Sequence, residues 1–158
     1  MRFPWKRLRI PILYYHEIGL PSSKHVLAPG AFEAQLSWLA DAGFQPLSLD
    51  AVADVYEGRR EAPDRGMALT FDDGRSGVGR HAAAALSRRG WPATLYVVTG
   101  WLDGAEIPDA ERYSEFLGWD EVRDLRDRGF TIVSHTVSHA NLKRIPVEAA
   151  AEEISASR

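Results

Sequence analysis

Residues 67–74 read MALTFDDG, an apolar run that ends in two adjacent aspartates and a glycine. Short apolar runs bounded by turn residues are typical of buried strands, so we predict a strand over residues 67–71. Two neighbouring carboxylates, Asp72 and Asp73, can face one pocket only if the chain turns, and Gly74 permits that turn. Taken alone, such a turn more often carries two solvated carboxylates, so its meaning depends on the rest of the chain.

Three similar apolar runs lie elsewhere in the chain, one before this stretch at residues 12–15 and two after it at residues 94–98 and 130–133. Helical patterns separate the runs. These patterns comprise Phe32, Leu36 and Leu39 on one helical face before Gly43, the alanine-rich residues 81–89 before Gly90, and Val122 with Leu125 in a helix that Asp120 can cap and Gly129 can end. Strands separated by helices of about ten residues imply parallel pairing with right-handed crossovers. The sequence therefore predicts an α/β fold with parallel strands.

Residues 134–139 read SHTVSH and directly follow the last of these strands. His135 and His139 are four residues apart, so in a helical turn their rings share a face and could hold one ion. This motif and the aspartates would both lie at carboxyl ends of parallel strands, where such folds place their chemistry. The chain has no cysteine, which leaves histidine and carboxylate as metal ligands. Three ligands and a spare carboxylate are the minimum for a metal-assisted hydrolase.

The remaining histidines and the aromatic residues are less specific. His16 ends the first strand and could reach the same rim as a proton donor or as part of a substrate-binding pocket, or it could make a structural hydrogen bond. His25 and His81 are expected at the surface. The long polar loop over residues 99–118 could border a substrate groove or be mobile. Four aromatic residues could stack on sugar rings, although two are expected to pack in the core: Trp91, Trp101, Tyr113 and Trp119.

Size, charge and composition narrow the function. With 158 residues and 45% apolar content, the chain can bury one core of ordinary domain size. Its 19 basic and 22 acidic residues give a net charge of −3, and no basic stripe indicates a nucleic-acid partner. No window is apolar enough for a membrane span. The apolar run after the basic residues 1–9 is too short for a signal peptide, so the sequence leaves the compartment open.

Two motifs give the chain a specific resemblance. Residues 70–74 (TFDDG) and 135–139 (HTVSH) resemble the first two signature motifs of the polysaccharide deacetylases, carbohydrate esterase family four, which share a NodB homology domain. Residues 13–19 (LYYHEIG), followed by a helix before Gly43-Phe44, resemble the branch that acts on poly-N-acetylglucosamine and related exopolysaccharides. The likeness extends over most of the chain, roughly residues 10–150.

The resemblance implies a distorted (β/α) barrel and a metal-dependent hydrolase of carbon–nitrogen bonds other than peptide bonds. Such an enzyme would remove N-acetyl groups from an N-acetylated polysaccharide or oligosaccharide of the poly-N-acetylglucosamine, chitin or peptidoglycan type. By this likeness Asp72 is the general base that activates a water, and zinc or a similar divalent ion is held by Asp73, His135 and His139.

The chain also departs from the family pattern. Arg75 occupies a place that is often aromatic. Later family motifs supply an arginine that orients the base, a tyrosine-bearing segment and an acidic histidine, but the chain ends at Arg158. We therefore expect a basic N-terminal segment over residues 1–9 and a deacetylase-like domain over residues 10–158, truncated at its C-terminus. The expected fold is an incomplete (β/α) barrel, and the fragment alone could be inactive.

Two other functions remain open from the sequence. The same fold could serve an amidase that acts on a small cyclic or linear amide, for which a closed pocket would be expected rather than an exposed groove. Alternatively, the chain could be a non-catalytic carbohydrate-binding relic that keeps the metal site. The relic would bind zinc and sugar without releasing acetate.

Overall fold

The computed structural model describes residues 10–21, 23–104 and 107–158, so the basic segment expected over residues 1–9 lies outside the described part. The elements in chain order are β1 (Ile12–Tyr15), β2 (Glu17–Ile18), β3 (Val26–Leu27), α1 (Pro29–Asp41), β4 (Gln45–Pro46), α2 (Leu49–Tyr56), β5 (Gly66–Phe71), η1 (Val78–Ala82), α3 (Ala83–Ser87), β6 (Ala93–Val97), η2 (Thr99–Gly104), η3 (Asp109–Glu111), α4 (Trp119–Asp127), β7 (Phe130–Ser134) and α5 (Val147–Ser155).

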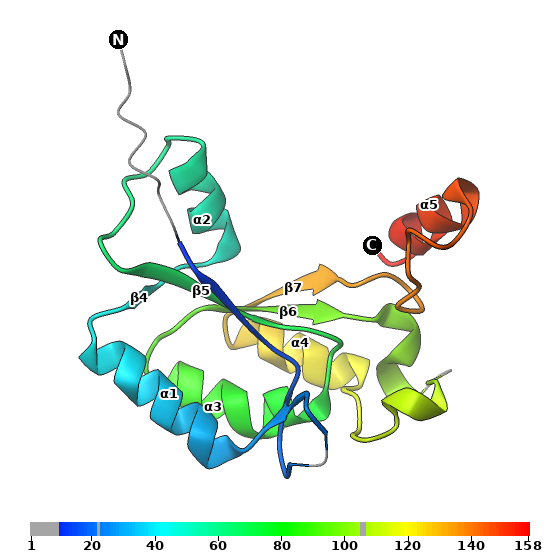
Figure 1. The fold of residues 1–158 in the computed structure, drawn as a ribbon, viewed down its shortest axis with the longest axis horizontal. Coiled ribbons are helices and arrows are strands. Elements are labelled where there is room, and N and C mark those ends of the chain that lie inside the picture. The colour runs from blue at the N-terminus through cyan, green and yellow to red at the C-terminus, as the bar shows by residue number, and fades with distance from the viewer. Residues whose placement is uncertain (1–9, 22, 105–106) are drawn as a thin grey trace.

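The main sheet is entirely parallel, with strand order β1-β5-β6-β7 and β4 paired with β5. Within the described residues β1 and β7 stand at opposite ends of this order, so the sheet is open (Figure 1). The prediction of an α/β fold with parallel strands and an incomplete barrel is confirmed. Because all strands run the same way, the carboxyl ends of β5, β6 and β7 meet at one edge of the sheet.

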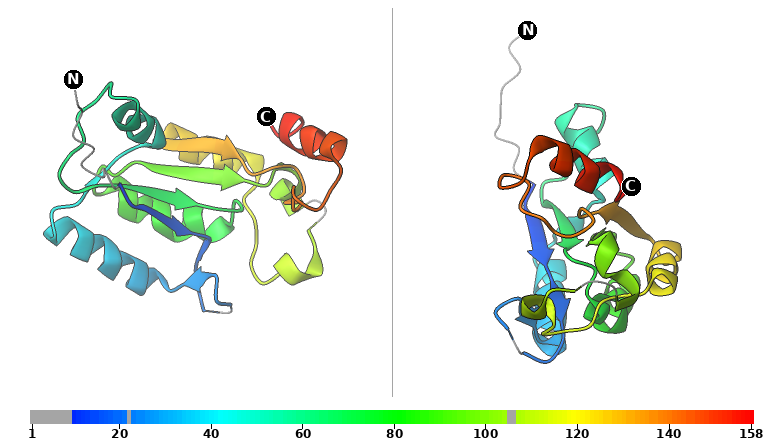
Figure 2. Two further views of the ribbon diagram at one scale, coloured as in Figure 1. Left: turned by 45° about the horizontal axis from the view of Figure 1, so that its top comes forward. Right: turned by 90° about the vertical axis from the view of Figure 1, so that its right-hand side faces the viewer.

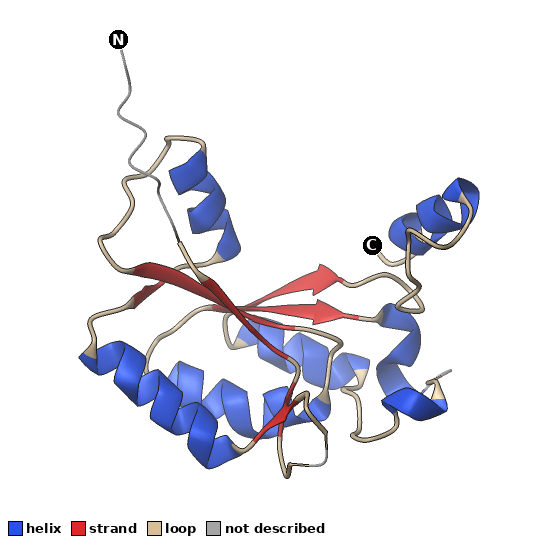
Figure 3. Ribbon diagram, viewed as in Figure 1, coloured by secondary structure: helices blue, strands red, loops and turns tan. Residues whose placement is uncertain are grey.

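Apolar clusters lie on both faces of the sheet, a larger one and a smaller one. Helices α1, α3 and α4 lie on one face and α2 lies near the other (Figure 1 and Figure 3). On β5 the side chains of Met67, Leu69 and Phe71 join the larger core with the first group of helices, whereas Ala68 joins a smaller cluster with α2. All six residues of β5 are buried. β5 is therefore a fully buried, mostly apolar strand in the centre of the fold, directly before the two aspartates.

Most predicted elements are present, with small shifts. Helix α1 buries Phe32, Leu36 and Leu39, as its periodicity indicates. The helix expected over residues 81–89 begins earlier, because a π-helical turn, η1, precedes α3. Helix α4 begins at Trp119, so Asp120 is not its cap. Instead, the N–H of Gly118 donates to the Glu121 carboxylate at 2.9 Å, which satisfies one free donor of the helix terminus.

The stretch over residues 99–118 is more structured than the expected polar loop. It contains the 3₁₀ segments η2 and η3, and it buries Trp101, Leu102 and Leu117. The N–H of Leu117 donates to the carbonyl oxygen of Gly74 at 2.9 Å, which ties this stretch to the turn after β5. Its described residues therefore form a wall beside that turn. Among the described residues, no helix is both long and apolar enough to cross a membrane.

Candidate metal centre

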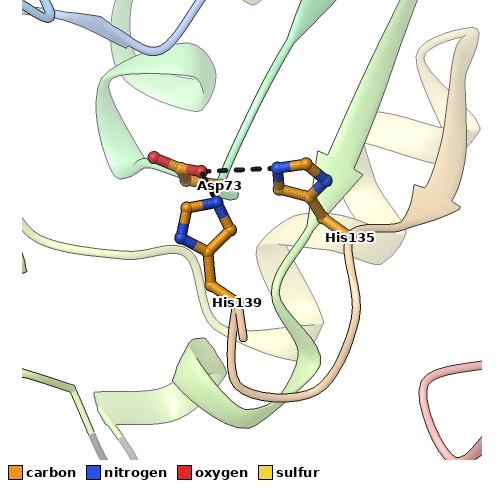
Figure 4. A group of neighbouring side chains, drawn as sticks. All are labelled: Asp73, His135 and His139. Atoms are coloured by element: carbon orange, nitrogen blue, oxygen red, sulfur yellow. Dashed lines mark ion pairs between the residues drawn. The ribbon is translucent and has the colours of Figure 1, made fainter. Parts of the chain in front are cut away.

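The two sequence motifs meet at the carboxyl edge of the sheet. Asp73 follows β5, while His135 and His139 follow β7, and β6 lies between these strands. Oδ1 of Asp73 is 3.8 Å from Nε2 of His135 and 3.8 Å from Nε2 of His139. Both imidazole rings point toward the carboxylate (Figure 4). Parallel pairing therefore brings together side chains that are more than sixty residues apart in the chain.

The acidic turn, residues 72–75, begins one residue earlier than the sequence suggests. Asp73 itself has a φ of 73°, and Gly74 follows with a φ of 78°. A left-handed conformation is unusual for a residue with a Cβ, although aspartate tolerates it better than most. The N–H of Asp72 still continues the strand, since it donates to the carbonyl oxygen of Tyr15 at 2.8 Å. The reversal at Asp73 directs its side chain into the protein, where only 3% of the residue is exposed.

Arg75 lies buried beside Asp73, which the sequence did not reveal. Its guanidinium contacts Oδ2 of Asp73 at 3.4 Å, pairs with the Glu111 carboxylate and donates to the Glu111 carbonyl oxygen at 2.7 Å. The rings of Tyr113 and Phe116 lie 4.0 and 4.3 Å from its central carbon. The two carboxylate oxygens of Asp73 therefore face different partners. Oδ2 faces Arg75, and Oδ1 is left for the histidines.

The histidine loop, residues 135–139, is not helical. Thr136 and His139 have φ values of 68° and 60°, so the expected helical turn is wrong. The rings nevertheless converge, with centroids 5.0 Å apart, because the loop itself reverses. One internal hydrogen bond supports this reversal, from the N–H of His139 to Oγ1 of Thr136 at 3.0 Å. The spacing of four therefore predicted that these two rings lie close together, but the helical turn behind that prediction is absent, and their role as ligands stays a prediction.

Burial sets the ionisation of the groups around this cluster. Burial raises the pKa of the Asp72 carboxyl above its ordinary value, although the charges of His135 and His16 pull it back in part. Burial also lowers the pKa of His135, against the opposing pull of Asp72. A neutral imidazole is the form that binds a metal. Because its pKa is lowered, His135 is already neutral near neutral pH and need not lose a proton to bind an ion.

Two further side chains, His16 and Tyr96, lie beside the site. His16 is close enough to Asp72 to act on its pKa, and its ring lies 4.9 Å from that of His25. Tyr96 on β6 packs 5.9 Å from the ring of His135, and the Asp72 charge adds to the burial that raises the tyrosine pKa. Tyr96 was missed, although its place one residue before the end of a central strand is a usable signal.

The aromatic residues suggested for sugar stacking divide by exposure. Trp101 is 2% exposed and packs against His139, with ring centroids 5.2 Å apart, so it supports a site residue and is not open to a sugar. Trp91 packs against the main core. Tyr113 lies over Arg75. Of the four, Trp119 is the most exposed, at 40%, and so is the best placed to contact a ligand.

The donor set fits a divalent metal ion. Oδ1 of Asp73 is buried and has no hydrogen-bond partner among the described residues, an expensive arrangement unless another group satisfies it. A tetrahedral ion with bonds of about 2.0–2.1 Å holds its ligand atoms roughly 3.4 Å apart, close to the separation of Asp73 from each histidine. The ligand atoms of Asp73, His135 and His139 all lie within 4.8 Å of one another, so the three side chains can hold one ion if they move slightly closer together.

Comparison with known families agrees with this arrangement. The family described as "Polysaccharide deacetylase" matches residues 59–158, well over half of the chain. The chain belongs to this family. The sequence-based assignment is thereby confirmed, and the matched residues include both motifs.

Individual relatives extend the comparison. The chain is 26% identical over 153 residues to YxkH of Bacillus subtilis (strain 168), covering 97% of this chain and 51% of that protein. It is 31% identical over 116 residues to the poly-β-1,6-N-acetyl-D-glucosamine N-deacetylase of Escherichia coli (strain K12), covering 67% of this chain and 17% of that protein. The chain therefore spans about half or less of these relatives.

Solved structures show the same fold. Superposition on the deacetylase PplD of Streptococcus pyogenes gives a TM-score of 0.81 at 24% identity, covering 95% of this chain and 66% of that one. The polysaccharide deacetylase BC0361 of Bacillus cereus gives a TM-score of 0.74 at 26% identity, covering 94% and 45%. The open parallel sheet described above is thus part of a fold shared with these deacetylases.

Proposed function

We propose that this protein hydrolyses the N-acetyl groups of an N-acetylglucosamine polysaccharide in a reaction that depends on a divalent metal. The observation that carries the proposal is the buried, unpartnered Oδ1 of Asp73 facing Nε2 of both histidines, with the Asp72 carboxylate next in the chain. The E. coli relative is named for poly-β-1,6-N-acetylglucosamine, which supports that polymer as the first substrate to try.

In this proposal Asp73, His135 and His139 hold the metal, and zinc is the ion we expect for two imidazoles and one carboxylate. When bound, the ion would polarise the acetamide carbonyl and lower the pKa of a water toward neutrality. Three protein ligands leave a position open for the substrate oxygen or the water. Arg75 holds Oδ2 of Asp73 and so keeps Oδ1 aimed at the histidines.

Asp72 is the proposed general base. Its carboxylate is half-buried and its pKa is raised by burial, which brings its basicity closer to what proton abstraction near neutral pH requires. The neighbouring His16 charge tempers that rise, so His16 would tune the base from the wall of the pocket and could contact substrate there. The site is open, because the side chains of His135 and His139 are 33% and 43% exposed. An open site suits a polymer better than a small amide.

The test is acetate release from poly-β-1,6-N-acetylglucosamine and chitin oligomers by the zinc-loaded protein. We expect a chelator to abolish release and zinc to restore it. Asp72→Asn should lower the rate by about 10²- to 10⁴-fold while leaving zinc affinity unchanged, because Asp72 is not a ligand. Asp64→Asn, at an exposed aspartate in a loop, is the matched control and should leave the rate unaltered.

Each failure has a distinct meaning. Activity that survives complete metal removal would overturn the metal assignment. Zinc and sugar binding without acetate release would favour the non-catalytic relic, and release from small amides alone would favour the amidase. A rate lost equally in Asp72→Asn and Asp64→Asn would overturn the assignment of the base.

A further inference from the structure

Glu153 on α5 binds the histidine loop directly. Its Oε2 accepts hydrogen bonds from the backbone N–H groups of Val137 and Ser138, both at 2.9 Å. Its Oε1 accepts a third hydrogen bond from Oγ of Ser138 at 2.6 Å. One carboxylate therefore satisfies two consecutive peptide donors and a hydroxyl that lie between the two candidate metal ligands.

The opposite face of the same peptides is held by η2. The N–H of Thr99 donates to the carbonyl oxygen of Thr136 at 3.1 Å, and the N–H of Gly100 donates to the carbonyl oxygen of Val137 at 2.8 Å. Val137 thus has its N–H bound by α5 and its C=O bound by η2. Between these contacts, the loop backbone has little freedom to rotate.

Helix α5 has no buried residue, so apolar packing does not account for its position beside the loop. Figure 2 shows α5 at the end of the sheet, away from the helices that cover its faces. Hydrogen bonds to a charged acceptor are shorter and roughly twice as strong as those between neutral groups. The three bonds of Glu153 are of this kind, and they lower its pKa, which keeps the carboxylate charged near neutral pH.

We propose that Glu153 is a positioning residue that holds the histidine loop in the shape in which His135 and His139 can share one metal ion. This inference rests on the proposed metal-dependent function. The physical reason is that the loop is only partly buried and contains two non-glycine residues, Thr136 and His139, in the left-handed region. The backbone strain of each such residue is comparable in size to the few hydrogen bonds that hold the loop in place. Removal of the Glu153 carboxylate should therefore let the loop open.

The test compares Glu153→Ala and Glu153→Gln with Glu152→Ala, a matched control at the exposed neighbouring position on the same helix. Zinc affinity is measured by competition with a chromogenic chelator, and ligand geometry by the visible absorption spectrum of the Co²⁺-loaded protein. We expect Glu153→Ala to weaken zinc binding about tenfold and to alter the Co²⁺ spectrum. Glutamine keeps one acceptor oxygen for the peptide donors. The zinc affinity of Glu153→Gln should therefore lie between those of Glu153→Ala and the parent.

A second readout does not need the metal. Amide hydrogen exchange of the metal-free protein should show faster exchange at Val137 and Ser138 in Glu153→Ala than in Glu152→Ala, with unchanged protection in β5 and β6. Equal zinc affinity and equal exchange in these two variants would overturn the proposal. A parent protein that binds no zinc would sink the proposed function instead, and the exchange comparison would still decide whether Glu153 holds the loop.

Discussion

The acidic turn and the histidine loop supply the two halves of one candidate centre, but they are held in opposite ways. The acidic turn follows a strand with every residue buried, and its Asp73 rests on Arg75 inside the protein. The histidine loop is partly exposed and is held by backbone hydrogen bonds to η2 and to Glu153. One half is fixed by burial and charge, the other by a set of individually replaceable hydrogen bonds.

This difference separates stability from metal affinity. A change beneath the acidic turn disturbs buried charge and should lower the stability of the whole domain. A change beside the histidine loop disturbs a partly exposed segment and should lower metal affinity with a smaller cost to folding. The comparison fails if both kinds of substitution affect both quantities to the same degree.

The largest effect is expected from Arg75→Met. Methionine occupies a similar volume, but it leaves the Asp73 and Glu111 carboxylates without the guanidinium that now pairs with both. Breaking a buried pair on one side costs about 3–5 kcal/mol of the free energy of unfolding, and we expect a loss near the lower figure because Glu111 is partly exposed. Denaturant unfolding of the metal-free variant and parent measures this loss in the free energy of unfolding.

The matched control is Arg80→Met, which breaks an ion pair with Glu115 between two exposed side chains. Such pairs contribute about 0–1 kcal/mol, so this variant should unfold close to the parent. If Arg75→Met were no less stable than Arg80→Met, the acidic turn would not depend on the buried guanidinium, and the contrast between the two halves of the centre would be lost.

Arg75 also shows where inference from sequence ends. The parallel strands, the core face of α1 and the pairing of the two motifs follow from local patterns, namely apolar runs, helical periodicity and turn residues. A buried arginine gives no such pattern. Its partner Glu111 is 36 positions away in the chain, and only the folded course of the 99–118 stretch brings the two together.

The histidine loop illustrates a second limit. Residue spacing alone cannot distinguish a helical turn from a loop with residues in the left-handed region. Here the segment is such a loop, since both Thr136 and His139 lie in that region. The carboxylate that holds this loop lies on α5, where an alanine- and glutamate-rich sequence indicates only a helix. The identities of the candidate ligands could be predicted, whereas the groups that position them depend on tertiary contacts.

A smaller effect on stability, confined to the loop, is expected from Gly100→Ala. A Cβ at this position would lie 2.6 Å from the carbonyl oxygen of Val137, a backbone atom that cannot move away without shifting the loop. Overpacking of this kind costs about 1–3 kcal/mol. Because the displaced peptide lies between the two histidines, we expect zinc affinity to fall about tenfold, as for loss of a ligand-orienting contact.

Gly30→Ala is the control for this substitution. Gly30 lies near the start of α1, and a Cβ there would meet nothing within 4 Å. Alanine is the better helix former, so this variant should match or slightly exceed the parent in stability and bind zinc equally well. Zinc affinity in Gly100→Ala equal to that in Gly30→Ala would show that the loop does not depend on the close approach of η2.

The subtlest effect concerns pH. Burial lowers the pKa of His135 below the ordinary 6.5, so in the metal-free protein its imidazole should titrate at a more acidic pH than a solvated one. The unfolded chain then binds more protons than the folded chain between the two pKa values. The contribution of His135 to the free energy of unfolding should therefore be fully present above pH 6.5 and be lost as the pH drops through that window. Asp72 opposes the shift, since its charge favours the imidazolium. Asp72→Asn should consequently move the His135 titration, followed by NMR of its ring protons, further toward acid. A titration at or above 6.5 in the parent would mean that burial does not control this imidazole. An unchanged or more alkaline titration in Asp72→Asn would mean that the Asp72 charge does not stabilise the imidazolium.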